Sequence, residues 1–268
     1  RAIINPYTGS EHIDRAEASG RGIVVGFGQT PENVAGMAEA TVLMLLDAFY
    51  DLKRAEQLLR EGGRRPAIRA RQLAGKTVGL IGFGRIAQAV AERLAGFDVE
   101  LLVSARRPPQ LPGYAAAAEL EDLLRRADAV LVLCSLNEST RDLLDRRRLA
   151  LMKPGAVLVN TARGGIVDEA ALAEAARAGH IGRLALDAFA AEPLPTDSPL
   201  RSLPDAVLTP HMIGHTVEAQ RSMQMTAAES VRRVLAGAPP VHLLNPEVLP
   251  AWTARYAPDG DDKAPSVE

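Results

Sequence analysis

The stretch from Thr77 to Leu94 reads Thr-Val-Gly-Leu-Ile-Gly-Phe-Gly-Arg-Ile-Ala-Gln-Ala-Val-Ala-Glu-Arg-Leu, and it decides the fold. Val78, Leu80 and Ile81 predict a short strand that is buried on both faces. From Arg85 onward the apolar residues recur at helical spacing. The stretch therefore predicts a strand that turns directly into a helix.

The junction between this strand and helix carries Gly82, Gly84 and Ala87, a G-x-G-x-x-A turn. Gly82 permits the sharp turn, Gly84 lets a ligand approach the backbone, and Ala87 allows close packing. The free N–H groups at the helix start would face an anion such as a pyrophosphate. A tight turn in an ordinary α/β domain is the alternative, so the decision depends on the downstream sequence.

Composition limits the class of protein. The chain has 268 residues and a net charge of −2, which gives no electrostatic reason to expect nucleic acid or a membrane as partner. Its one cysteine, Cys134, fits a reducing compartment, and we expect a cytoplasmic protein. Because Arg1 stands next to the apolar pair Ile3-Ile4, we expect the chain to start inside a domain.

The first part of the chain predicts two strands and two helices. We expect strands at residues 2–4 and 22–25, a short helix at 13–18, and a long helix at 35–61 that ends at Gly62-Gly63. The first half of the long helix is apolar almost all round, which is typical of a helix buried between domains or subunits. This face favours a homodimer.

The middle of the chain predicts a parallel sheet. Besides the opening strand, short apolar runs cover residues 99–103, 129–133, 156–160, 184–186 and 206–208. Most of them alternate with helical patterns, for example at 119–126 and 168–178. The fold class is therefore α/β, a doubly wound (Rossmann) parallel sheet. A last helix at 216–235 and an extended return at 239–246 precede a tail, which we expect to be disordered from residue 255.

The end of the second strand of such a sheet selects the cofactor. An acidic residue there binds the ribose of NAD and repels the extra phosphate of NADP. This strand ends Val103-Ser-Ala-Arg-Arg-Pro108, without an acid. Ser104, Arg106 and Arg107 can all bond a phosphate, which favours NADP over NAD. Two solvated surface arginines are the alternative.

Three segments that follow predicted strands carry chemically useful side chains. Residues 160–168 (Asn-Thr-Ala-Arg-Gly-Gly-Ile-Val-Asp) present Arg163, a fork of donors suited to a carboxylate. Residues 185–193 (Ala-Leu-Asp-Ala-Phe-Ala-Ala-Glu-Pro) present Asp187 and Glu192, and Thr209-Pro-His-Met-Ile-Gly214 presents His211. Since all three leave the carboxyl edge of one sheet, we expect them to converge.

Four motifs in this order and spacing resemble the D-isomer-specific 2-hydroxyacid dehydrogenases: the glycine turn, the NTARGGIVDE segment, the ALDAFAAEP segment and the TPH segment. The resemblance implies a second, smaller, flavodoxin-like substrate domain, truncated at its N-terminal side. It places a partial substrate domain and linking helix at 1–71, and the dinucleotide-binding domain at 72–215. A return helix and segment follow at 216–254, and a tail at 255–268.

By the same resemblance, His211 is the general acid–base, with Glu192 as its carboxylate partner. Arg163 binds the substrate carboxylate and polarises the ketone, and Asp187 holds the nicotinamide carboxamide. The segment Tyr7-Thr-Gly9 resembles the loop that holds the substrate, so substrate contacts are assigned to Thr8, Gly9, Arg163 and His211. Further cofactor contacts are assigned to Gly82, Phe83, Gly84, Arg85, Ile86, Cys134, Leu136 and Thr161.

Each of these assignments has a plainer alternative. Arg163 can be a surface arginine, Glu192 a loop carboxylate, and His211 a capping residue. His215, four residues after His211, hints at a metal pair, but the neighbouring Pro210 and Gly214 argue against a helical metal face, and we expect no metal. Ser135 stands where the family usually has proline, which we expect to alter the nicotinamide wall slightly.

The leading hypothesis is an NADP-preferring oxidoreductase that moves a hydride between the cofactor and a 2-keto or 2-hydroxy acid, with glyoxylate or hydroxypyruvate as first guesses. Two alternatives stay open. One is NAD-linked oxidation of a bulkier hydroxy acid. The other is a non-catalytic protein that senses dinucleotides, like the corepressor relatives of the family.

Overall fold

The computed structural model describes residues 1–64, 70–106 and 110–257. The chain divides into two compact units, one made of Arg1–Val34 together with the residues from His215 onward, and one of Ala35–Gly214. The predicted domain boundaries at residues 71 and 215 remain a prediction.

The larger unit is built on a parallel sheet of seven strands in the order β5-β4-β3-β6-β7-β8-β9. The chain order reverses between β3 and β6, the switch point at which ligands bind in such sheets. The predicted doubly wound fold is therefore confirmed. The strands are β3 (Thr77–Ile81), β4 (Glu100–Ser104), β5 (Ala115–Ala117), β6 (Ala129–Val132), β7 (Ala156–Asn160), β8 (Ile181–Leu186) and β9 (Ala206–Leu208).

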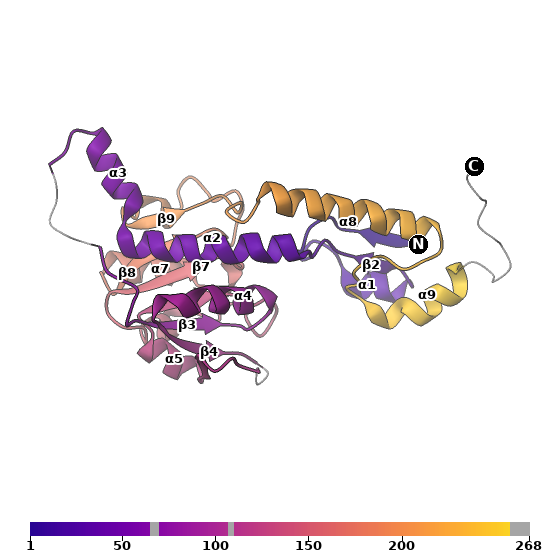
Figure 1. Cartoon of the computed structure of the whole chain (residues 1–268), viewed down its shortest axis with the longest axis horizontal. Helices are drawn as coiled ribbons and strands as arrows, with labels where there is room; N and C mark the ends of the chain where they lie inside the picture. Colours follow the sequence, from indigo (N-terminus) through magenta and orange to yellow (C-terminus); the bar gives the residue numbers. More distant parts are fainter. Residues whose placement is uncertain (65–69, 107–109, 258–268) are drawn as a thin grey trace. The chain divides into compact units, whose positions relative to one another are not determined.

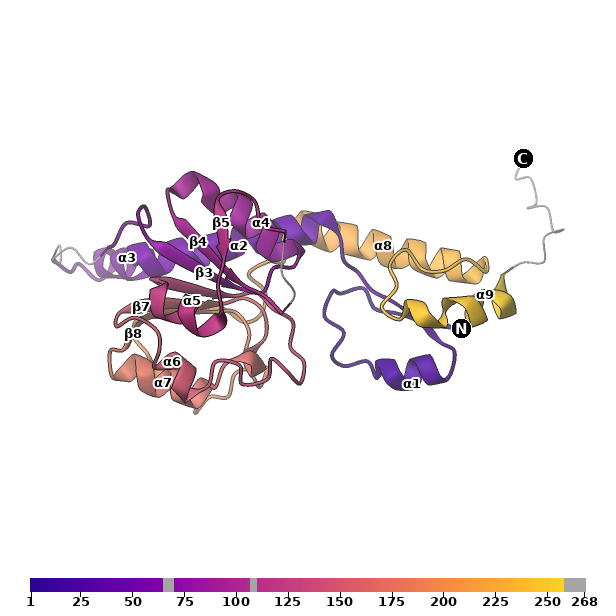
Figure 2. The ribbon, with the colours of Figure 1, turned by 90° about the horizontal axis from the view of Figure 1, so that it is seen from below.

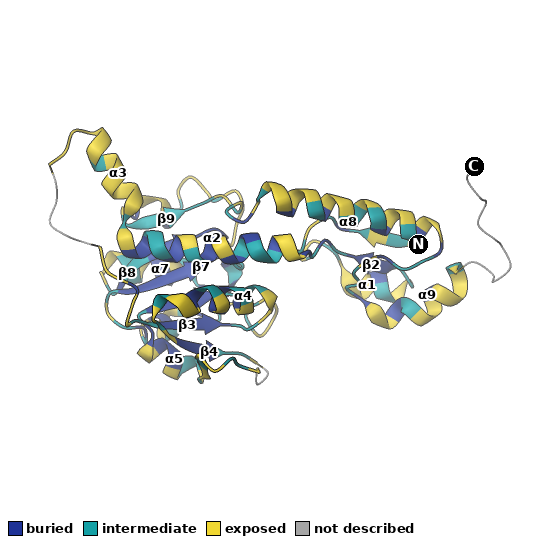
Figure 3. Cartoon of the chain, in the orientation of Figure 1, coloured by how far each residue is buried: buried dark blue, intermediate teal, exposed yellow. Residues whose placement is uncertain are grey.

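Helices cover both faces of this sheet (Figure 2). On one face, α2 (Pro31–Tyr50) and α4 (Arg85–Leu94) pack on Val78 and Leu80. On the other, α5 (Leu120–Arg126), α6 (Arg146–Leu149) and α7 (Glu169–Arg177) pack with Ile81. The central strands β3, β6 and β7 are buried from both sides (Figure 3), as their continuous apolar runs predict, whereas the edge strands β5 and β9 are partly exposed.

The predicted long helix at 35–61 is wrong in one respect, because it is broken at Asp51. The residue has φ +58° and separates α2 from α3 (Leu52–Arg60). Its carboxylate accepts a bond of 2.6 Å from Arg183, and the Asp47 carboxylate accepts one from Leu52 N at 3.1 Å. These two bonds stabilise the break.

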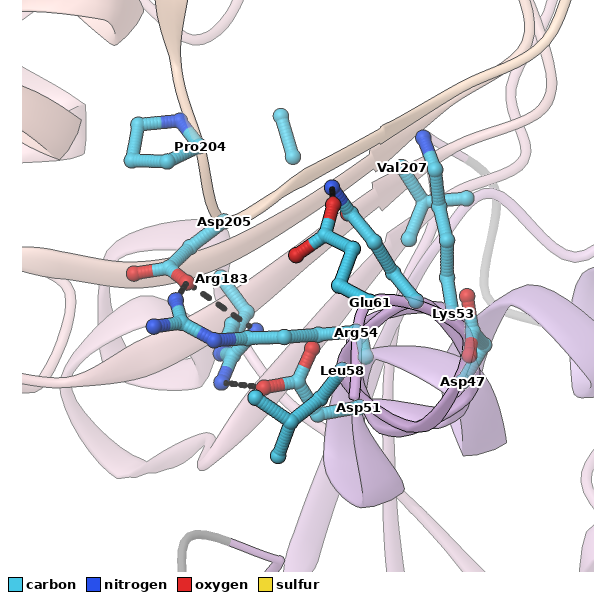
Figure 4. A pocket seen from close by; sticks show the side chains of 13 residues that line it. Asp47, Asp51, Lys53, Arg54, Leu58, Glu61, Arg183, Pro204, Asp205 and Val207 are labelled. Carbon is cyan, nitrogen blue, oxygen red and sulfur yellow. Dashed lines mark hydrogen bonds and ion pairs between the residues drawn. The ribbon is translucent and has the colours of Figure 1, made fainter. Parts of the chain in front are cut away.

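A shallow pocket of about 390 Å³ lies beside the break (Figure 4). Arg183 bonds Asp51 and Asp205 there, and Arg54 of α3 also reaches Asp205 at 3.3 Å. The pocket is lined by these charged side chains together with apolar ones such as Leu58, Pro204 and Val207, and none of the predicted site residues takes part in its lining.

The smaller unit contains two parallel strands, β1 (Ala2–Ile4) and β2 (Val24–Gly26), with three helices (Figure 1). The helices are α1 (Arg15–Gly20), α8 (Val217–Leu235) and α9 (Leu249–Tyr256). Helix α9 was not expected, and it continues to Tyr256, past the start of the tail predicted to be disordered. It buries Trp252, which donates a bond of 2.7 Å to Arg1 O. Residues 258–268 of that tail lie outside the described residues.

Two weaker elements also escaped the sequence analysis. Strand β5 is a run of three alanines, and α6 has only four residues, so neither carries a clear periodicity. Short 3₁₀ turns cover Ala95–Phe97, Gly164–Ile166, Pro199–Ser202 and Pro246–Val248. Across the described ranges, no helix is long and apolar enough to cross a bilayer.

Candidate active site

The glycine turn after β3 has the geometry that its residues predict. Gly82 has φ +96°, and a Cβ there would lie 2.8 Å from Cys134 Cα. Both the backbone conformation and the lack of space therefore exclude a larger residue. Around Gly84 the space is open, and no side chain caps the start of α4. Backbone N–H groups at an open, uncapped helix start fit a pyrophosphate. The turn can therefore hold a dinucleotide.

The other predicted cofactor contacts lie around this turn. Phe83 is in the turn itself and is partly buried, and Arg85 and Ile86 begin α4. Ser104 ends β4 and accepts the Gly82 N–H at 2.8 Å through its carbonyl. Arg106 is exposed two residues later, and Arg107 lies outside the described residues.

Cys134 and Leu136 follow β6, and Thr161 follows β7. Burial raises the pKa of the Cys134 thiol to about 11, so the thiol stays protonated at neutral pH and is no nucleophile. Leu136 packs at the edge of the core. The buried Thr161 hydroxyl bonds Thr41 of α2 at 2.9 Å. Its assignment as a cofactor contact stays a prediction.

The loops after β8 and β9 bring Glu192 and His211 together. His211 Nδ1 lies 2.7 Å from Glu192 Oε2 and 2.9 Å from Oε1. The two side chains are 38% and 37% exposed, so both can be reached from solvent. Because the carboxylate can only accept, Nδ1 carries a proton and Nε2 is left to exchange one.

Asp187 holds the loop that carries His211. It is 1% exposed, and its Oδ1 accepts the Thr209 hydroxyl at 2.7 Å, Met212 N at 3.0 Å and Ile213 N at 3.2 Å. His211 itself has φ +52°, a conformation that needs such support. The sequence analysis missed this role, although an acid directly after a buried strand was a usable signal.

Arg163 lies in a loop that its neighbours fix. The buried Asn160 side chain donates to Arg163 O at 2.9 Å and accepts from Ala162 N at 3.0 Å. Arg163 Nη1 donates to Ala162 O at 2.8 Å. A Cβ on the next residue, Gly164, would lie 1.9 Å from Phe189 C. The Arg163 loop therefore packs directly on the loop that carries Glu192.

Thr8 and Gly9 belong to the smaller unit. Thr8 Oγ1 lies 3.1 Å from Asn33 Oδ1, and Gly9 O accepts from Asn5 Nδ2 at 2.6 Å. These bonds tie the loop of residues 5–9 to the chain around it. Substrate contacts of Thr8 and Gly9 stay a prediction.

Comparisons with known proteins place this chain in a family. Residues 42–213 match the family described as D-isomer specific 2-hydroxyacid dehydrogenase, NAD binding domain. The chain belongs to this family, and the resemblance noted from its motifs is confirmed. The NAD binding domain supports a nicotinamide dinucleotide as cofactor.

The relatives that the chain matches carry different enzyme names. A D-3-phosphoglycerate dehydrogenase of Mycobacterium tuberculosis is 42% identical over 235 residues, which cover 85% of this chain and 44% of that relative. A glyoxylate reductase of Thermofilum pendens is 38% identical over 259 residues, 92% of this chain and 76% of that protein. The crystal structure of an NADPH-dependent glyoxylate/hydroxypyruvate reductase from Sinorhizobium meliloti has a TM-score of 0.84 and 30% identity, covering 91% of this chain and 78% of that one. The chain thus spans less than half of the phosphoglycerate dehydrogenase.

We predict that Asp187→Ala destabilises the protein. The substitution leaves a hydroxyl and two backbone N–H groups without their acceptor, which should lower the free energy of unfolding by about 2–4 kcal/mol. Urea denaturation measures this loss. Asp197→Ala, at an exposed position of the following loop, is the control and should change stability by less than about 0.5 kcal/mol. Equal stability of the two variants would contradict the role of Asp187.

Proposed function

We propose that the protein is an NADP-preferring reductase of small 2-keto acids, with glyoxylate and hydroxypyruvate as the first substrates to test. The observation that carries the proposal is the Glu192–His211 pair, 2.7 Å apart, at the same sheet edge as the open glycine turn. Relatives named as glyoxylate and hydroxypyruvate reductases support the choice of substrate.

The side chains have separate tasks in this reaction. A bound reduced dinucleotide, held through its pyrophosphate at the glycine turn, would supply a hydride for the α-carbon of the keto acid. His211 donates a proton from Nε2 to the carbonyl oxygen, and Glu192 stabilises the imidazolium that holds this proton. Arg163 binds the substrate carboxylate through its fork of donors. In the oxidative direction His211 must be neutral and accepts the proton.

The pH profile tests the acid–base pair. Glu192→Gln keeps an oxygen near His211 Nδ1 but removes the charge that stabilises the imidazolium. Reduction needs the protonated ring, so the decline of kcat/KM with rising pH should move to lower pH. Glu92→Gln on the exposed side of α4 is the control and should keep the wild-type profile. Superimposable profiles of the Glu192 variant and wild type would remove Glu192 from the mechanism.

The NADP preference rests on the end of β4. Ser104 and the exposed Arg106 follow the glycine turn without an acid between them. By the family resemblance, Ala105 stands where NAD-using members carry the acidic residue. An arginine can bond the 2′-phosphate of NADPH, a group that NADH lacks.

Replacing Ala105 with Asp and Arg106 with Gln should reverse this preference. A charge-assisted bond contributes about 1.5–3 kcal/mol, or about 10- to 200-fold in affinity, and the new carboxylate repels the phosphate. The measurement is the ratio of kcat/KM for NADPH and NADH. Arg125→Gln, an exposed arginine of α5, should leave this ratio unchanged. A wild-type protein that already favours NADH tenfold would overturn the assignment.

We also propose that the protein is a homodimer in which a second copy covers α2 and α3. Leu43 and Tyr50 on α2, and Leu52 and Leu59 on α3, are each more than half exposed. Each pair is seven residues apart, so its members share one side of their helix. Single exposed apolar residues are ordinary, but four large ones on consecutive helices favour an interface.

Light scattering measures this assembly directly. Wild type should have about twice the chain mass of 28.6 kDa, and Leu52→Glu combined with Leu59→Glu should lower it to one chain, because two charges would be buried in the interface. Leu235→Glu, at an equally exposed position of α8, should leave the dimer intact. A monomeric wild-type protein would refute the proposal.

A further inference from the structure

Two consecutive backbone amides in the loop after β8 donate to two different carboxylates. Phe189 N donates to Glu192 Oε1 at 2.9 Å, and Ala190 N donates to Glu169 Oε1 at 2.6 Å. Glu169 is the first residue of α7 and is half-buried. Glu169 therefore holds the loop at Ala190, and Glu192 holds it at the neighbouring Phe189.

The position of this loop decides where Glu192 points. Gly164 packs against the Phe189–Ala190 peptide so closely that a Cβ would lie 2.1 Å from Ala190 N. Within this packing, the Ala190 N–H lies beside the amide that Glu192 already accepts. Adjacent amides form a small anion-binding site, and Glu169 supplies the acceptor for the second of these two amides.

The charges of the two carboxylates are also coupled. Burial raises the pKa of Glu169, the Ala190 N–H opposes this, and the charge of Glu192 adds a smaller upward effect. The repulsion between the two carboxylates is relieved most when His211 is protonated. The negative charge of Glu169 should therefore favour the imidazolium.

We propose that Glu169 is a positioning residue, which keeps the Glu192 carboxylate directed at His211 and thereby stabilises the protonated form of the imidazole. This inference rests on the acid–base pair of the proposed function. Glu169 touches neither ring nitrogen of His211 in the described contacts, so it acts through Glu192.

The charged groups around Glu169 come from several elements. Glu192 faces it from the loop after β8, and His211, from the loop after β9, is bonded to Glu192. On its own helix, Asp168 caps the first turn, and Arg146 of α6 lies near Asp168 and pairs with Glu174. The charge of Glu192 raises the pKa of Glu169.

The test is an NMR pH titration of the His211 ring in the full chain, which needs no turnover. The chain has five histidines, and a His211→Gln variant identifies the signal. Glu169→Gln keeps an acceptor for Ala190 N but loses the charge, so the midpoint should fall by about 0.3–0.5 pH units. Glu169→Ala loses both and should lower the midpoint further. Glu92→Gln should leave it within about 0.1 unit.

A double-mutant cycle shows whether the effect passes through Glu192. In a Glu192→Gln background, adding Glu169→Ala should shift the midpoint by less than half as much as it does in wild type, because the partner through which it acts is absent. A midpoint of Glu169→Gln equal to that of Glu92→Gln overturns the inference. So does an equal shift from Glu169→Ala in both backgrounds.

The failure of the pair itself gives a different result. If Glu192→Gln alone leaves the His211 midpoint unchanged, Glu192 is not the partner of His211, and the proposed acid–base function is overturned together with this inference. A shifted midpoint in Glu192→Gln with none in either Glu169 variant overturns the role of Glu169 alone.

Discussion

The bond set around the Asp187 carboxylate is the constraint on which the candidate site depends. One buried oxygen accepts from Thr209, Met212 and Ile213, and these three residues surround His211. A residue at φ +52° between them cannot relax while its neighbours are held. The buried Asp187 carboxylate thus fixes the loop in which His211 lies 2.7 Å from Glu192.

Close contacts at two glycines bring the remaining loops to the same edge. Gly82 packs on Cys134, which joins the turn after β3 to the loop after β6, and Gly164 packs on Phe189, which joins the loops after β7 and β8. In each case a methyl group would collide with the backbone of the neighbouring loop. Polar side chains carry the chemistry of the site. The close approach of the loops that hold them depends on glycines, which have no side chain.

The sheet supplies the rigid base for these loops. Its central strands are buried on both faces. Because all seven strands run parallel, every loop that carries a site residue of the larger unit leaves from one edge. This arrangement explains why motifs more than a hundred residues apart in sequence, such as the glycine turn and the segment around His211, lie along the same edge of the sheet. It is also the arrangement shared with the reductases and dehydrogenases to which the chain is similar.

The sequence alone determined the strand–turn–helix at residues 77–94, the parallel sheet and the family, because these follow from local periodicity and from the order of short motifs. It also predicted that Glu192 and His211 would converge, although it could not provide their distance. Tertiary structure decided what depends on partners far along the chain. Asp51 breaks the long helix beside Arg183, 132 residues away, and the Thr161 hydroxyl bonds Thr41, 120 residues away. The bond from Ala190 N to Glu169 was also decided by tertiary structure, because Ala190 lies 21 residues further along the chain and in a different loop. Local propensity contains no information on such contacts, because the packing of distant segments creates them.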